Sequence, residues 1–208
     1  MNTHSGASLV RGCSLALLLI LGSVGVAVAQ PTFSVRGNVG ASFFRSPDAT
    51  SSVLNSGTNL GLETELRLYR GFGLTVGVSY DTFTLNEENA QIYARGGGDL
   101  SFLGGMLGLR YTFVNDSDAH PYVTLGGGMY RALVSDRKEI TDEGELVDAA
   151  DDISTRQEGI HIAAGARFRL DDTYAVFGEP RFTFFDVDRG LDNSLRYFTL
   201  RLGVDVQL

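Results

Sequence analysis

The chain has 208 residues, of which 17 are lysine or arginine and 25 are aspartate or glutamate, so its formal net charge is −8. This length is enough for one barrel or sandwich domain. The acidic balance argues against a nucleic-acid-binding protein, because such proteins neutralise phosphates with lysine and arginine. The single cysteine, Cys13, cannot form a disulfide within the chain, so the fold must be stabilised by its sheet and core alone.

The first 29 residues have the three-part pattern of a secretory signal peptide. A polar segment with one charge, Arg11, is followed by an apolar segment at residues 13–26 and by the small-x-small sequence A-V-A at residues 27–29. A transmembrane helix is the alternative, but the uncharged run is shorter than the roughly 20 residues that span a bilayer. We therefore predict a cleaved signal peptide at 1–29, export, and one mature domain at 30–208.

The rest of the chain repeats one pattern, in which apolar residues alternate with polar residues or glycine. In residues 197–208 every even position is apolar, and the odd positions are polar residues, glycine or tyrosine. An extended strand with this period of two has one apolar and one polar face. About ten residues also suit a strand that crosses a bilayer. The predicted strands are residues 33–43, 60–69, 72–81, 102–113, 121–130, 159–170, 174–184 and 197–208.

The connections between these strands alternate in length. Those after the second, fourth and sixth strands are short, and the others are long. This alternation is typical of an up-and-down barrel with both ends of the chain on the periplasmic side. The longest connection, residues 134–157, is acidic. Its spacing is not that of a calcium-binding loop, and a run of acids is usually a solvated surface, so we expect no metal site.

One residue fits its predicted strand poorly. Pro180 lies in the middle of the seventh strand, where it cannot donate a hydrogen bond to a neighbouring strand. We therefore expect a bulge or a lost hydrogen bond at this position.

The polar face of the predicted strands is charged, which indicates that the apolar face is the outer one and meets lipid. The interior of an eight-stranded barrel is about wide enough for side chains, so these charges must neutralise each other or remain costly. We interpret these charges as a salt-bridged polar core. The alternative, suggested by the excess of two arginines over acids, is a path for anions through the barrel. The predicted interior charges are Arg36, Glu63, Glu65, Arg67, Asp81, Arg110, Arg167, Arg169, Glu179, Arg181, Arg201 and Asp205.

With these features the chain resembles the small eight-stranded outer-membrane barrels, namely the OmpA-type transmembrane domain and its OmpX-like and opacity-protein-like relatives. The segments that carry the resemblance are H-P-Y-V-T-L-G-G-G at 120–128, G-A-R-F-R-L at 165–170, F-G-E-P-R-F at 177–182 and the alternating terminal strand. The resemblance implies an all-β, eight-stranded, antiparallel, up-and-down transmembrane β-barrel in the cell outer membrane of a diderm bacterium. It also implies insertion by the barrel assembly machinery, although Leu208 replaces the terminal aromatic residue that is usual in the family.

Three further arginines fall on the apolar face near the outer ends of their strands: Arg45, Arg131 and Arg196. They either extend to the level of the lipid headgroups or pair with lipopolysaccharide phosphates. The expected partners are therefore outer-membrane lipid and lipopolysaccharide, with no nucleic acid, and we expect a monomer.

No catalytic arrangement is visible in the sequence. His120 falls in a predicted periplasmic turn, and His161 faces inward with Ala163 where lipid A deacylase barrels would offer a serine. An inward histidine bonded to Asp81 or to a tyrosine is the simpler interpretation. Because a nucleophile and a base must converge, we predict no enzyme, no catalytic residue and no cofactor.

The sequence thus predicts a non-enzymatic integral outer-membrane barrel that presents surface loops and serves envelope structure or surface contact. Two alternatives remain at this point. One is a narrow channel for small solutes or anions, and the other is a soluble periplasmic barrel that binds a ligand.

Overall fold

The computed structural model of the protein describes residues 32–46, 54–92, 97–141, 146–148, 152–185 and 195–208. The predicted signal peptide and the first two residues of the predicted mature domain lie outside these ranges. The elements are β1 (Thr32–Ser46), β2 (Gly57–Arg67), β3 (Phe72–Phe83), α3 (Glu87–Ile92), β4 (Gly97–Thr112), β5 (Ala119–Ile140), β6 (Leu146–Asp148), β7 (Ile153–Arg169), β8 (Tyr174–Phe185) and β9 (Arg196–Gln207). None of the described helices is long and apolar enough to cross a membrane.

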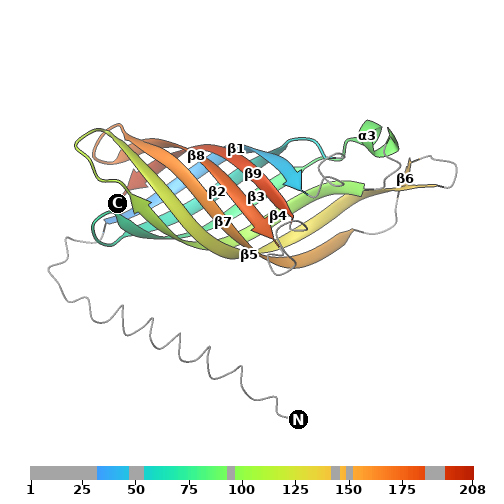
Figure 1. The fold of residues 1–208 in the computed structure, drawn as a ribbon, viewed down its shortest axis with the longest axis horizontal. Helices are drawn as coiled ribbons and strands as arrows, with labels where there is room; N and C mark the ends of the chain where they lie inside the picture. The colour runs from blue at the N-terminus through green and yellow to red at the C-terminus, as the bar shows by residue number, and fades with distance from the viewer. Residues whose placement is uncertain (1–31, 47–53, 93–96, 142–145, 149–151, 186–194) are drawn as a thin grey trace, which may run out of the picture. The chain divides into compact units, whose positions relative to one another are not determined.

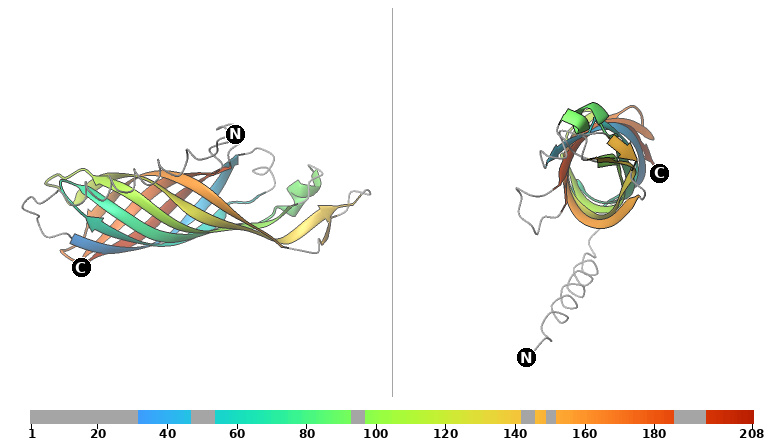
Figure 2. Two further views of the ribbon diagram at one scale, coloured as in Figure 1. Left: turned by 90° about the horizontal axis from the view of Figure 1, so that it is seen from below. Right: turned by 90° about the vertical axis from the view of Figure 1, so that its right-hand side faces the viewer.

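Eight of the described strands form a closed ring, which Figure 2 shows along its axis in the right-hand view. Each strand pairs antiparallel with the next in the chain, in the order β1-β2-β3-β4-β5-β7-β8-β9. The ring closes between the first and last strands, where Val35 lies opposite Val206 and Val39 opposite Leu202. The predicted eight-stranded antiparallel up-and-down barrel is therefore confirmed, and closure removes the free sheet edges that would otherwise template aggregation.

The three short connections are tight turns at one end of the barrel. Between β2 and β3, Arg70 and Gly71 have φ angles of 49° and 86°, in the left-handed region that glycine adopts without strain. A Cβ on Gly71 would lie only 2.2 Å from the backbone oxygen of Thr112. Between β7 and β8, Asp171 Oδ1 accepts hydrogen bonds from the backbone N–H groups of Thr173 and Tyr174, at 2.8 and 2.7 Å. By the usual topology of such barrels, this is the periplasmic end.

The connection predicted at residues 134–157 differs in the structure, because much of it is strand. β5 continues to Ile140, β7 begins at Ile153, and β6 pairs with the end of β5. Together with the first residues of β4, these segments form a ribbon that projects beyond the ring (Figure 1). A strand exposed to water on both faces carries polar residues on both, so the two-residue period that marks the other strands is absent here.

Charged pairs accompany the ribbon. Lys138 Nζ on β5 donates to Asp148 Oδ1 on β6 at 2.6 Å, and this hydrogen bond together with the aspartate charge raises the pKa of Lys138. Arg137 also lies 3.3 Å from Glu139. The two carboxylates are exposed and the two cations are half-buried, and surface pairs of this kind contribute little to stability. The part of the acidic segment at residues 142–145 and 149–151 lies outside the described residues.

Pro180 interrupts the ladder between β7 and β8 as predicted. Ala163 pairs with Arg181 and Ala166 pairs with Gly178, but the two positions between them are unpaired, and the register on either side is unchanged. The irregularity is therefore a loss of hydrogen bonds and not a bulge. On its other edge, β8 keeps its pairing, with Pro180 opposite Leu200.

The outer surface of the ring is apolar and the interior is polar. Leu202, Leu125 and Leu60 are each at least 60% exposed, whereas Arg36, Arg110 and Glu179 are buried. Apolar residues are exposed around the whole barrel. This is the inverse of the arrangement in a soluble protein, in which apolar residues form the core. This arrangement indicates a lipid-facing belt around a charged interior.

Candidate functional site in the barrel interior

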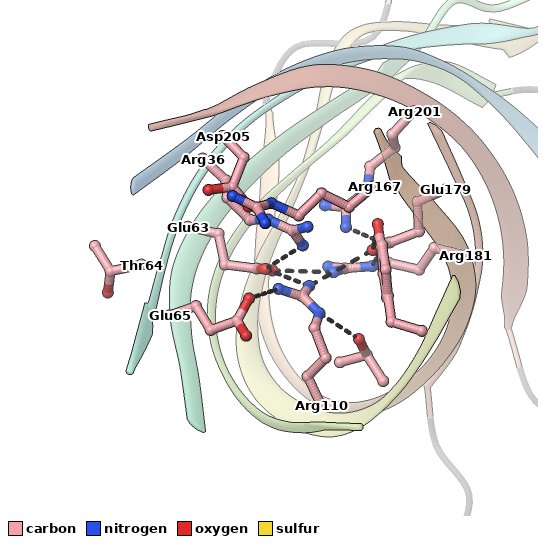
Figure 3. A network of polar contacts seen from close by, with 12 residues as sticks. Arg36, Glu63, Thr64, Glu65, Arg110, Arg167, Glu179, Arg181, Arg201 and Asp205 are labelled. Carbon is pink, nitrogen blue, oxygen red and sulfur yellow. Dashed lines mark hydrogen bonds and ion pairs between the residues drawn. The ribbon is translucent and has the colours of Figure 1, made fainter. Parts of the chain in front are cut away.

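The middle of the interior holds three arginines and three glutamates, which we call the central layer. Its members are Glu63 and Glu65 on β2, Arg110 on β4, Glu179 and Arg181 on β8, and Arg201 on β9. All six side chains are buried, and their formal charges sum to zero. Figure 3 shows them converging from opposite walls of the barrel.

Arg110 is the hub of the central layer. Its Nη2 lies 2.6 Å from Glu63 Oε1, its Nη1 lies 2.7 Å from Glu65 Oε2, and its Nε donates to Thr124 Oγ1 at 3.0 Å. Charge-assisted hydrogen bonds from a planar guanidinium group to two carboxylates are both strong and directional. The two glutamates stand two residues apart on β2, and the alternation of the strand therefore turns both toward the lumen.

Glu179 closes the layer on the opposite wall. Its carboxylate accepts hydrogen bonds from Arg201, from Arg181 at 3.2 Å and from the hydroxyl of Tyr122 at 3.0 Å. Arg181 also reaches across the lumen to Glu63 Oε2, at 3.2 Å. The layer therefore links β2, β4, β8 and β9 directly. Such a network is stable because each buried charge has opposite charges as neighbours.

A second group of charges lies nearer the periplasmic end, and we call it the periplasmic layer: Arg36, Arg67, Arg167 and Asp205. Arg36 Nε donates to Asp205 Oδ2 at 2.8 Å, and Arg167 Nε lies 3.1 Å from the same oxygen. Arg67 Nη2 is 3.9 Å from it. The guanidinium group of Arg36 also lies over the ring of Phe177, 4.4 Å from its centroid, which is a cation–π contact. Three arginines thus share one carboxylate.

Arg169, which the sequence places among the interior charges, lies outside them. Its side chain is 48% exposed, and its Nη2 pairs with Asp118 Oδ1 at 2.8 Å. Arg169 ends β7 at the rim, where the barrel wall stops and the side chain can turn to the β4–β5 connection. The interior therefore has six arginines and five acids among the described residues, in place of the predicted seven and five.

Toward the extracellular end the interior is aromatic, a feature that the sequence reading missed. We define the aromatic cluster as Phe44, Phe83, Phe102, Tyr130, Phe185 and Tyr197, all buried. Phe102 stacks on Phe185 with ring centroids 5.0 Å apart, and Tyr130 meets Phe185 edge to face at 4.8 Å. Continuing the alternation of each strand by one or two residues would have placed Phe44, Phe83 and Phe185 inward.

Asp81 lies between the aromatic cluster and the central layer. It accepts hydrogen bonds from Ser42 at 2.7 Å, from Asn59 at 2.9 Å and from the hydroxyl of Tyr197 at 3.0 Å. Three neutral donors therefore satisfy this carboxylate, and it belongs to neither layer of arginines. A cavity of about 10 Å³ beside it is at the lower limit for one water molecule.

The structure describes two of the three histidines, His120 and His161. His161 is buried, and its Nδ1 has no hydrogen-bond partner, so the predicted bond to Asp81 or a tyrosine is not made by this atom. His120 is the second residue of β5 and not part of a turn, and it lines the periplasmic opening. Within the described ranges, no three His, Cys, Asp or Glu side chains gather closely enough to hold a metal ion.

Of the three outward arginines, Arg45 and Arg196 lie at the outer ends of β1 and β9 as predicted. Arg131 lies in the middle of β5, because this strand continues to Ile140. Arg45 and Arg131 are exposed and Arg196 is half-buried. Arg131 Nε donates to Ser154 Oγ at 2.8 Å, and the residue directly opposite Arg131 in the β5–β7 ladder is Arg156, also exposed. Among the described side chains, none of these four arginines forms an ion pair. Like charges directly opposite each other destabilise a strand pair, so this pair favours an anion between them.

The apolar belt, the closed ring and the charged interior together define an integral membrane β-barrel of the outer-membrane class. The chain belongs to the family of the outer membrane protein beta-barrel domain, whose sequence pattern matches residues 14–207. The family places the protein in the outer membrane. A search of curated proteins finds no match.

Solved structures with the same fold include surface proteins of several bacteria. Neisserial surface protein A aligns with a TM-score of 0.59 at 15% identity, over 85% of this chain and 97% of that one. Ail, the attachment invasion locus protein of Yersinia pestis, aligns with 0.53 at 13% identity, over 86% and 97%. OprG from Pseudomonas aeruginosa aligns with 0.50 at 15% identity, over 86% and 96%. At these identities the likeness is one of fold.

Proposed function

We propose that the protein is a non-enzymatic outer-membrane anchor that presents extracellular connections for surface contact. The projecting ribbon carries this proposal. β5 has 22 residues, about twice the roughly 9–11 that a strand needs to cross a bilayer. β4 and β7, on either side of it, have 16 and 17 residues, whereas β8 and β9 have 12 each. The three longest strands are thus neighbours, and their surplus length forms a structured projection; β1, with 15 residues, is the next longest.

The interior supports an anchor and argues against the channel alternative. The neutral central layer spans the lumen, and the aromatic cluster fills it farther out, so an ion would have to pass two packed layers. Breaking buried ion pairs costs several kcal/mol. We therefore expect no conductance from the protein in a planar lipid bilayer, and stepwise ion currents would contradict the proposal. The soluble alternative would require the apolar belt to face water, which is unfavourable over so large an area.

The expected setting is the outer membrane of a diderm bacterium, reached by export with a signal peptide and by insertion through the barrel assembly machinery. The barrel acts as a monomer. Its outward arginines contact lipopolysaccharide phosphates, to which guanidinium groups bind with two parallel hydrogen bonds. Ail is named for attachment, and its barrel gives a precedent for this use of the fold.

Shortening the ribbon tests the role in surface contact. A variant in which a short turn replaces residues 135–152 should keep the barrel, because Val134 and Ile153 lie opposite each other and can be joined directly. A folded band whose gel mobility changes on boiling would show this. Cells bearing the variant should adhere less to a host-matrix or abiotic surface than cells with the full chain. A matched control shortens the connection at 84–96. Equal adhesion of all three strains would count against surface contact and leave envelope structure as the role.

Lipopolysaccharide contact has its own test. Replacing Arg45, Arg131 and Arg196 by glutamine, with and without Arg156→Gln, should reduce the lipopolysaccharide that co-purifies with the folded barrel. The loss should be larger when Arg156 is included, because the opposed pair is then removed. Unchanged co-purification in both variants would show that these arginines only extend to the headgroup level.

A further inference from the structure

The periplasmic mouth of the barrel contains a cavity of about 240 Å³. Its lining consists of Arg67, Gly71, Thr112, Val114, His120 and Arg167, from β2, the β2–β3 turn, β4, the β4–β5 connection, β5 and β7. Two arginines and a histidine therefore face one space that opens toward the periplasm, and no acidic residue lines it. A phosphate ion fits easily within this volume.

The balance of charge along the barrel axis places an excess of positive charge at this cavity. The central layer is neutral, with three arginines and three glutamates. In the periplasmic layer, Arg36, Arg67 and Arg167 have one carboxylate of their own, that of Asp205. Their contacts with the glutamates of the central layer are long, 3.7 Å from Arg36 to Glu63 and 3.4 Å from Arg67 to Glu65. The mouth thus carries an excess of two positive charges, and partly buried charges of one sign favour a bound counter-charge.

The guanidinium groups that line the cavity have donors to spare. Arg167 Nε is buried and makes no hydrogen bond, although it lies 3.1 Å from Asp205. Arg67 is 29% exposed, and its two hydrogen bonds, to Glu65 and to Gln207 Oε1, are 3.4 and 3.3 Å long. Both are longer than the 2.7–2.9 Å usual for a charge-assisted bond. The ion pair of Arg167 Nε with Asp205 is thus not a hydrogen bond, and a buried donor that makes no hydrogen bond is costly. An entering oxoanion would supply acceptors for both arginines.

We propose that the periplasmic mouth binds a soluble phosphate-type oxoanion between Arg67 and Arg167, with His120 and Thr112 as further polar contacts. Tetrahedral phosphate presents acceptors to several donors at once, which suits two guanidinium groups that approach from different strands. The cavity lies inside the ring and faces the aqueous side, so the ligand reaches it from the periplasm and not from the bilayer. The central layer blocks the passage of an anion farther along the lumen. The excess of arginine therefore belongs to a binding site that is closed at its inner end, and not to a channel.

Titration of the folded, detergent-solubilised protein with inorganic phosphate, by calorimetry at constant ionic strength, tests this proposal. We expect saturable binding of phosphate, and binding at least about tenfold weaker for chloride and for acetate. Arg67→Gln and Arg167→Gln should each weaken phosphate binding by about tenfold or more, a loss of roughly 1.4 kcal/mol. Arg169→Gln is the matched control, because this arginine lies at the same end of β7 but pairs with Asp118 outside the cavity. It should bind phosphate as the unchanged protein does.

Three results would overturn the proposal. They are the absence of saturable phosphate binding, equal affinity for chloride, and equal weakening by Arg169→Gln. The gel-mobility shift on boiling shows whether each variant is folded. If Arg167→Gln does not fold, Arg67→Gln decides the question alone, because Arg67 lies at the rim and its bonds are weak. Titration with vesicles of a phosphate-bearing lipid separates the sources: binding of the lipid headgroup in place of free phosphate would also refute a soluble ligand.

Discussion

Replacing Glu179 by glutamine should destabilise the barrel strongly while leaving its shape unchanged. Glu179 is fully buried and accepts hydrogen bonds from Arg201, Arg181 and Tyr122. Glutamine keeps the size and one acceptor oxygen but removes the charge, so the central layer would hold three arginines against two glutamates. Breaking a buried ion pair by removing one partner costs about 3–5 kcal/mol. We expect the free energy of unfolding to fall by that amount.

A second substitution separates charge balance from the loss of hydrogen bonds. In the double variant Glu179→Gln with Arg201→Gln, the layer again contains equal numbers of positive and negative groups. The double variant should therefore be more stable than the sum of the two single changes predicts, by at least about 1 kcal/mol, within the range measured for residues in one network.

Unfolding by urea in lipid vesicles measures these free energies. Circular dichroism is the suitable signal, because the chain has no tryptophan. Arg169→Gln is the control: an exposed pair is removed, and the change should stay within about 0.5 kcal/mol. A cost below about 1 kcal/mol for Glu179→Gln, or strict additivity in the double variant, would refute the view that mutual neutralisation stabilises the interior.

Three other substitutions test the belt and a turn. Leu202→Arg, at the middle of a crossing strand, should cost about 2–4 kcal/mol of unfolding free energy in vesicles, whereas Leu170→Arg at the periplasmic rim should cost about 0–1 kcal/mol. The two leucines are similarly exposed, at 64% and 66%. Equal costs for the two substitutions would therefore contradict a lipid-facing belt. Gly71→Ala should lower stability by about 1–3 kcal/mol, because its φ of 86° and the nearby oxygen of Thr112 leave no room for a Cβ; the same urea titration checks this, and an unchanged midpoint would show that the turn relaxes freely.

The strands and the orientation of their faces could be predicted from the sequence, because the alternation of side chains is a local property of an extended chain. The same alternation placed Arg110, Glu179 and Arg201 inward. Prediction from this alternation failed in the ribbon beyond Leu133, where the two faces of the strand no longer differ in polarity. It also failed at Phe44, Phe83 and Phe185, where the predicted strands ended too early. In these places both faces meet similar surroundings, or the strand end resembles a loop in composition.

The sequence by itself therefore determined that this protein is a β-barrel with an apolar outside and a charged inside. Only the tertiary structure decided which charges meet. Arg36 pairs with Asp205, 169 residues away, and Arg181 with Glu63, 118 residues away. Which residues meet across such separations in the sequence depends on the register with which eight strands close into a ring, and no single strand encodes that register. The same closure left Arg169 outside the interior and gathered Arg36, Arg67 and Arg167 around one carboxylate at the periplasmic mouth.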